Sequence, residues 1–252
     1  SEHAQYPAFD RLLEAAGAAN NGSTTEDRTN YYEAGPANAL SLMLWLDADR
    51  MGYLLPTMDG PKVDLQRDVV KNERRQSYDN QPYGLASETI GHMLYPADHP
   101  YYWPVIGSMA DLSAASLEDV KEFFRKYYAP NNATIVVAGD VRPDSVRALV
   151  RGYFGAIPRG PAITRDAPPA FSLQRDSMAV LEDRVQLPRL YYTWHTVKGT
   201  ANDDPALSVL AYILAGTKNA RLTRPLVYTD QLATNVRAYQ DGSRLDGQFG
   251  IV

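Results

Sequence analysis

The stretch Gln66-Arg67-Asp68-Val69-Val70-Lys71-Asn72-Glu73-Arg74-Arg75-Gln76 has the composition of a helix and decides how the first half of the chain is interpreted. Residues three, four and seven positions apart share a helix face, so Gln66, Val69 and Val70 lie on the side of Glu73. We therefore expect a carboxylate on a half-buried face. Such a charge needs a metal ion or a buried arginine, because burying it alone is strongly unfavourable. The alternative is a solvated surface glutamate, the usual case in a charged helix.

The overall composition is that of an ordinary globular protein. With 252 residues, 44% of them hydrophobic and 22% charged, the chain can form one large domain or two smaller ones. The net charge of −5 argues against nucleic acid as a partner, since phosphate binding needs a basic face. The most apolar run, 39–46, is far shorter than the roughly 20 residues that span a bilayer, so no membrane insertion is expected.

The chain contains no cysteine and only four histidines. The first fact excludes thiolate metal ligands, a cysteine nucleophile and disulfides. The histidines, at positions 3, 92, 99 and 195, lack the spacing that places two metal ligands on one helix face. No motif decides the compartment, and we favour the bacterial periplasm or secretion over the cytoplasm.

Apolar periodicity, caps and breakers predict an alternation of helices and strands. The expected helices are 7–16, 37–51, 61–79, 85–94, 117–128, 144–154, 205–214 and 221–228, and the expected strands are 133–139, 178–182, 189–197, 232–239 and from 248 onward. A Pro-rich linker at 159–175 would join a first α/β unit, 1–158, to a second, 176–252. The chain begins at Ser1-Glu2-His3 and ends in a strand-like run, so we interpret it as a fragment with a truncated second unit.

Five pieces of sequence, in order, carry a family resemblance. They are Asn21–Tyr32, Val69–Arg74, Tyr128–Asp140, Tyr153–Pro158 and Ala220–Leu222. No single piece is specific, but together they resemble the insulinase/pitrilysin (M16) family of zinc metallopeptidases, whose members include mitochondrial processing peptidase, and the match runs essentially end to end. The resemblance implies an α+β fold with two similar subdomains, built of mixed, largely antiparallel sheets with helices packed on one face.

The resemblance also implies a zinc site. In this family a His-x-x-Glu-His motif on an early helix supplies two zinc ligands and the general base, and a later Glu completes the site, leaving one position for water. Glu73 falls at that later ligand. The motif itself is not in this sequence, and His3 is interpreted as a surface residue. Gln66 stands where relatives often have a Glu that supports the ligand, and its amide can still donate a hydrogen bond.

Substrate handling follows from the same resemblance. Family members bind an extended peptide as an added edge strand, and the matching edge here is Asn21, Gly22 and Ser23. The alternative for these residues is an ordinary hairpin. The aromatic loop around Trp103 either lines a peptide chamber or packs between the two units. A second homologous half or subunit is the expected partner, because relatives grip the scissile carbonyl with residues of that half.

Three hypotheses remain open. The first is a catalytic-half fragment of a zinc endopeptidase, in which case this chain alone is inactive and does not bind zinc tightly. The second is a non-catalytic family member acting as a structural or substrate-presenting subunit, against which the retained Glu73 argues. The third is an unrelated α/β domain with fortuitous motif matches.

Overall fold

The computed structural model describes residues 1–165, 167–168 and 171–252. Contacts between residues divide the chain into two compact units, each made of two segments. The first unit joins 1–72 with 108–165, and the second joins 73–107 with 166–252. Residues 73–107 thus group with the later part of the chain, whereas the expected division cut the chain once, at 159–175. Residues 166, 169 and 170 of that linker lie outside the described residues, and the linker stays a prediction.

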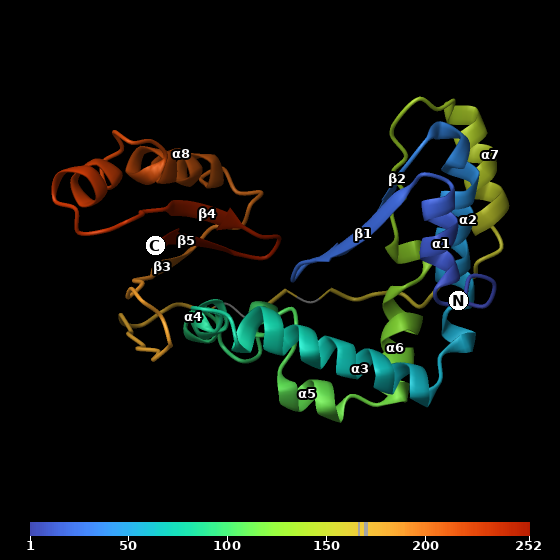
Figure 1. The fold of residues 1–252 in the computed structure, drawn as a ribbon, viewed down its shortest axis with the longest axis horizontal. Coiled ribbons are helices and arrows are strands. Elements are labelled where there is room, and N and C mark those ends of the chain that lie inside the picture. The colour runs from blue at the N-terminus through green and yellow to red at the C-terminus, as the bar shows by residue number, and fades with distance from the viewer. Residues whose placement is uncertain (166, 169–170) are drawn as a thin grey trace. The chain divides into compact units, whose positions relative to one another are not determined.

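The first unit combines helices with one two-stranded antiparallel ribbon (Figure 1). Its elements are α1 (Ala8–Ala15), β1 (Ala19–Thr24), β2 (Thr29–Ala34), α2 (Leu40–Tyr53), α3 (Gly60–Arg74), α5 (Met109–Ala114), α6 (Leu117–Tyr127) and α7 (Pro143–Phe154). Short 3-10 turns lie at Ala37–Ala39, Leu55–Thr57 and Pro130–Asn132. The last two residues of α3 belong to the second unit.

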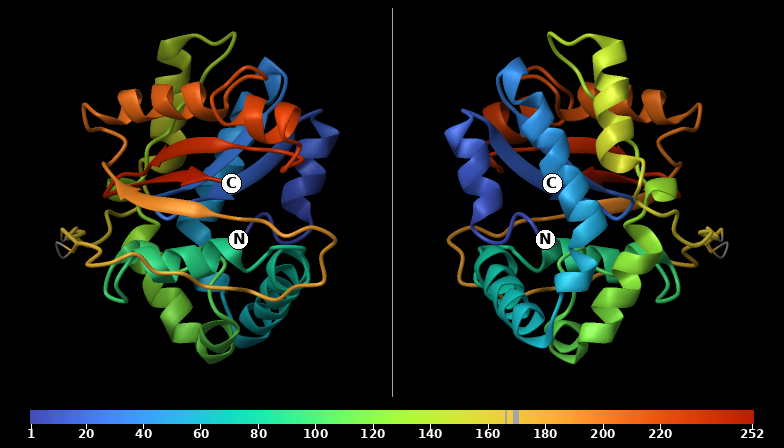
Figure 2. Two further views of the ribbon diagram at one scale, coloured as in Figure 1. Left: turned by 90° about the vertical axis from the view of Figure 1, so that its left-hand side faces the viewer. Right: turned by 90° about the vertical axis from the view of Figure 1, so that its right-hand side faces the viewer.

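Two apolar helix faces organise this unit. Leu13 of α1 and Leu46 of α2 are almost fully buried and form a core with Ala4 and Ala18. On the other side α2 packs along α7, as the right-hand view of Figure 2 shows. The hydroxyl groups of Ser41 and Tyr153 share a hydrogen bond of 2.7 Å across that contact. α2 is therefore the central helix of the unit, and its position fixes the elements on both sides.

The second unit contains a three-stranded antiparallel sheet. Its helices are α4 (Ala86–Leu94) and α8 (Asp204–Ala215), its strands are β3 (Tyr192–Thr196), β4 (Ala238–Gly242) and β5 (Gly247–Ile251), and further turns lie at Arg75–Asp79, Pro100–Tyr102 and Arg224–Thr229. The strand order is β3-β5-β4, and α8 packs against β4 (Figure 2). An aromatic core of Leu94, Tyr95 and Tyr101 lies between α4 and the 3-10 turn that follows it.

Most predicted helices are present within a few residues of their expected ends, but two predicted strands are wrong. Residues 133–139 and 178–182 are all described and form no strand. Val136 is 83% exposed and Met178 is 87% exposed, so neither apolar run is buried as a strand inside a sheet would be. The strand expected at 232–239 is displaced to Ala238–Gly242. The helix expected at 221–228 is a π-helical turn at Arg224–Thr229.

Candidate functional site

The face of α3 that carries Glu73 is exposed, contrary to the half-buried face expected from the sequence. Glu73 and Gln66 are both exposed, Val69 is 49% exposed and Leu65 is 69% exposed. The more buried side of α3 instead carries Arg74, which is buried, together with the half-buried Arg67, Val63 and Val70, at helical spacings of 7, 11 and 4 residues from Arg74. Because two arginines interrupt the apolar pattern, a search for apolar residues alone does not identify this face. The seven-residue spacing of the arginines is the sequence signal that indicates it.

Arg67 and Lys71 attach the middle of α3 to the first unit. The Arg67 guanidinium donates a 2.6 Å hydrogen bond to the Ala115 carbonyl oxygen, and the Lys71 ammonium group donates one of 2.9 Å to the Ser113 hydroxyl. Both acceptors belong to α5 or to the residue after it, and α3 and α5 run side by side in Figure 1. Polar contacts to α5 thus hold the middle of α3 within the first unit.

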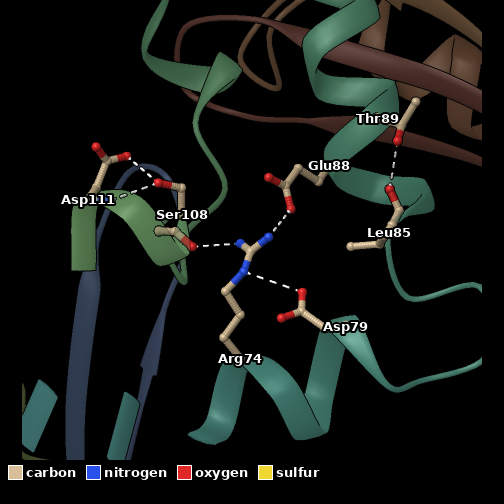
Figure 3. Close-up of polar contacts among 8 residues, drawn as sticks. Arg74, Asp79, Leu85, Glu88, Thr89, Ser108 and Asp111 are labelled. Carbon is tan, nitrogen blue, oxygen red and sulfur yellow. Dashed lines mark hydrogen bonds and ion pairs between the residues drawn. The ribbon is translucent and has the colours of Figure 1, made fainter. Parts of the chain in front are cut away.

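Arg74, the last residue of α3, belongs to the second unit and is only 7% exposed. Its guanidinium donates to a Glu88 carboxylate oxygen at 2.8 Å and to the Gly107 carbonyl oxygen at 2.6 Å (Figure 3). Its Nε atom lies 3.4 Å from a carboxylate oxygen of Asp79. Because Glu88 belongs to α4, Arg74 joins the end of one helix to the start of the next.

The helix changes from α-helical to π-helical immediately after Arg74. A π-helical turn occupies Arg75–Asp79, closed by a hydrogen bond of 2.9 Å from the Asn80 amide to the Arg75 carbonyl oxygen. The next turn is tight, because a Cβ on Gly84 would lie 1.9 Å from the Tyr78 carbonyl oxygen. Such π-helical turns are often found at functional sites. Glu73 is the last residue but one before this change.

The Glu73 carboxylate has no protein partner in the part of the chain that the structure describes. No hydrogen bond or ion pair of its side chain is found among those residues. Nor do the described residues include a group of three or more His, Cys, Asp or Glu side chains arranged to hold a metal ion. An exposed, unpaired carboxylate fits the role of one metal ligand, and the residues described here do not make a complete site.

The predicted peptide-binding edge lies on β1. Asn21, Gly22 and Ser23 are exposed, and they pair with Tyr32, Tyr31 and Asn30 of β2. Among the described residues β1 has β2 as its one strand partner, so its other edge is open. The Gly22 amide donates a 2.8 Å hydrogen bond to the Asn21 side-chain oxygen. An added strand could use this amide only if the Asn21 side chain moved away.

A cluster of charged and phenolic side chains holds β2 against α2. Arg50 lies over the Tyr31 ring and forms an ion pair with Asp47. Burial, the negative charge of Asp47 and the hydrogen bond shared with it raise the pKa of the Glu33 carboxyl group to about 7, against the opposing charge of Arg50. Burial and the hydrogen bond with Tyr128 raise the pKa of Tyr31 as well. No motif in the sequence indicates this cluster, because β2, α2 and Tyr128 are separate segments of the chain.

Three of the histidines make polar contacts with other residues of the chain. His3 lies 2.6 Å from the carboxylate of Asp49, which also accepts a 3.1 Å hydrogen bond from the Ala4 amide. His99 is 1% exposed and accepts a hydrogen bond from the Tyr101 amide, and burial lowers its pKa. His195 pairs with Asp246. Trp103, in the aromatic loop, is 53% exposed, whereas Tyr101 in the same loop is buried.

Comparisons of sequence and of structure with known proteins point to the same family. Residues 114–252 match the family model described as the peptidase M16 inactive domain. The chain is 30% identical over 229 residues to the zinc protease PqqE of Helicobacter pylori, covering 90% of this chain and 51% of that protein. It is similar to the crystal structure of a protease from Helicobacter pylori, with a TM-score of 0.84, 27% identity and coverage of 97% of this chain and 59% of the other.

A further solved structure extends the likeness of fold. It is the first half of the periplasmic protease PqqL from Escherichia coli, with a TM-score of 0.68, 18% identity and coverage of 97% of this chain and 54% of that one. These likenesses confirm the predicted α+β class. The chain spans about half the length of the curated relatives it matches. Among the helices that the structure describes, none has the length and apolar character needed to cross a membrane.

Proposed function

Because this chain belongs to the M16 peptidase family, we propose that it forms part of a zinc-dependent endopeptidase and supplies Glu73 as one ligand of the metal. The observation that carries the proposal is the state of this side chain. Glu73 follows the Val69-Val70 pair that resembles the family's ligand-bearing helix, and its carboxylate is exposed and unpaired within the described residues. Gln66 lies seven residues earlier on the same helix face and would support the Glu73 carboxylate by hydrogen bonding.

Zinc, when bound in such a site, acidifies a water molecule and polarises the scissile carbonyl group. The described residues of this chain offer one carboxylate toward it. The remaining ligands and the general base would come from other parts of the protein. The contribution of this chain is therefore to hold one ligand in place on a helix whose end is fixed by Arg74.

The substrate would be a peptide or a small unfolded protein bound as an extra strand. The open edge of β1 at Asn21–Ser23 supports this, because main-chain hydrogen bonds at a sheet edge tolerate many sequences. We propose a second homologous half or subunit as the partner, in line with a structural neighbour that is itself named as a first half. The periplasmic name of that neighbour also favours the periplasm or secretion for this protein.

A second candidate is a non-catalytic subunit that presents substrate or stabilises a partner. It is favoured by the description of the matching family model as an inactive domain. That match covers residues 114–252 and so does not include α3 or Glu73. The exposure of Glu73 does not separate the two candidates, because a solvated glutamate is common on a charged helix. The zinc content of the protein does separate them.

The full-length protein that contains this chain tests the proposal. Its zinc content, measured by mass spectrometry, should be one ion per chain in the wild type and should be lost in Glu73→Gln. Glu118→Gln is the matched control, because Glu118 is an exposed glutamate on α6 paired only with Arg125. Zinc retained in Glu73→Gln would contradict the role of Glu73. A wild type without zinc and without peptidase activity would support the non-catalytic candidate.

A further inference from the structure

Arg74 is the buried neighbour of the proposed metal ligand. Consecutive residues on a helix point about 100° apart, so a side chain anchored inward at 74 turns residue 73 away from the same contact. The exposure of the two side chains agrees with this geometry, because Arg74 is 7% exposed and Glu73 is exposed. The orientation of Glu73 thus depends on how firmly Arg74 is held.

The Arg74 guanidinium is held mainly through its two terminal nitrogens, because its buried Nε makes no hydrogen bond to the described residues. Its two terminal nitrogens donate to Gly107 and Glu88, and its Nε faces Asp79 (Figure 3). The side chains of Arg74, Glu88 and Asp79 are 8%, 16% and 32% exposed, so the ion pair with Glu88 is more buried than the one with Asp79. Because two carboxylates already balance its charge, Arg74 is not available to pair with Glu73.

The anchor also lies where the helix is least regular. α3 ends at Arg74 and the π-helical turn begins at Arg75. A small rotation of the backbone at this junction would therefore change the direction of the Glu73 side chain. A metal ligand must be held within narrow limits of position and angle, and partners outside the ligand set commonly provide this.

We infer that Arg74 is a positioning residue, which together with Glu88 fixes the end of α3 so that the Glu73 carboxylate faces outward and stays free for a metal ion. This inference rests on the proposed function. It goes beyond that function because neither Arg74 nor Glu88 is a ligand and both act through the helix backbone.

The test uses the full-length protein and three variants of the anchor: Arg74→Met, Arg74→Lys and Glu88→Gln. Zinc affinity is measured by competition with a coloured chelator, and the geometry of the site by the visible absorption of the cobalt-substituted protein. Arg147→Met is the matched control, because Arg147 is 71% exposed and pairs with the exposed Asp144. Thermal unfolding followed by circular dichroism separates loss of folding from loss of metal.

We expect Arg74→Met to weaken zinc binding about 10- to 100-fold and to change the cobalt spectrum. Arg74→Lys should lie between it and the wild type, because lysine keeps the charge but cannot donate in a fork. Glu88→Gln should weaken zinc binding less, since an amide oxygen can still accept the hydrogen bond. Arg147→Met should leave both readouts unchanged.

Other outcomes would overturn the inference in distinguishable ways. If Glu73→Gln loses zinc while the folded Arg74 and Glu88 variants bind it like the wild type, Arg74 has only a structural role and the proposed function stands. If Glu73→Gln keeps its zinc, the proposed function itself fails. If Arg74→Met does not fold, Arg74→Lys and Glu88→Gln decide, and wild-type affinity and spectrum in both would contradict the inference.

Discussion

The guanidinium carbon of Arg50 lies 3.8 Å from the centroid of the Tyr31 ring. Arg50 belongs to α2 and Tyr31 to β2, so this cation–π contact joins the ribbon to the central helix of the first unit. The Tyr31 hydroxyl also shares a 2.8 Å hydrogen bond with that of Tyr128, the residue after α6. The ribbon that offers the proposed peptide edge is therefore held from its β2 side, and the β1 edge stays open.

The first prediction concerns pH and Glu33, on the same strand. Its pKa rises from 4.5 to about 7 because of burial and the nearby Asp47. The folded state thus binds a proton more tightly than the unfolded state. The resulting stabilisation is fully present below about pH 4.5 and is lost as the pH rises through about 7. Glu33→Gln, which resembles the protonated form, should be more stable than the wild type at pH 8 by about 1–2 kcal/mol and nearly equal at pH 4.5.

Urea denaturation of the chain at the two pH values measures this difference. Glu26→Gln, at the exposed tip of the ribbon, serves as a control that removes the same charge at a solvated position. A Glu33→Gln variant that is no more stable than the wild type at pH 8 would show that the Glu33 and Asp47 carboxyl groups are not coupled.

A second prediction concerns Asp49, which is 2% exposed. Burial alone would raise its pKa, but hydrogen bonds from Ser1, His3 and the Ala4 amide outweigh this and lower it. Its stabilising contribution is present above the unfolded pKa and is lost as the pH falls through the lower folded value. Asp49→Ala should cost about 2–4 kcal/mol, because it leaves the buried Ala4 amide without its acceptor.

Chemical denaturation at pH 7 checks that cost, with Asp144→Ala as the matched control. The Asp144 side chain is 90% exposed and its ion pair with Arg147 joins two neighbouring turns of α7, so its loss should change stability little. Equal effects of the two substitutions would mean that Asp49 is not the anchor of the N-terminal segment.

The helices were predictable because their signals are local. Ser116 caps α6 in a capping box with Asp119, and Gly17, with φ of 71°, follows the end of α1. The strand expected at 133–139 was wrong because an apolar run becomes a strand only with a partner strand, and no local pattern supplies one. The family fold could still be predicted, since the resemblance depends on the order of motifs rather than on any one strand.

The candidate site was only partly predictable. The sequence singles out Glu73 but predicts a half-buried face for it, because Val69 and Val70 share that side of the helix. The more buried side includes arginines whose partners, such as Glu88 and Gly107, lie 14 and 33 residues away. Periodicity identifies a helix face, but it does not say whether a charged residue on that face finds a buried partner.

A third prediction tests the β1 edge in the full-length protein. Gly22→Pro removes the amide that now bonds to the Asn21 side chain, and proline is tolerated at the open edge of a sheet. Because an added strand would lose this donor, we expect the KM for a peptide substrate to rise several-fold with a smaller change in kcat. Glu26→Pro, in the tight turn between Thr25 and Arg28, is the control for general effects of proline on the ribbon. An unchanged KM would exclude Gly22 from substrate binding.

The last prediction concerns the 252-residue chain by itself. It should cleave no peptide and bind zinc no more tightly than a single exposed carboxylate does, because one such ligand cannot replace the water shell of the ion. Isothermal titration of the chain with zinc, repeated on Glu73→Gln, measures this directly. Two weak and indistinguishable titrations are expected. Tight binding of one ion in the wild type, lost in Glu73→Gln, would mean that other residues of this chain complete the site.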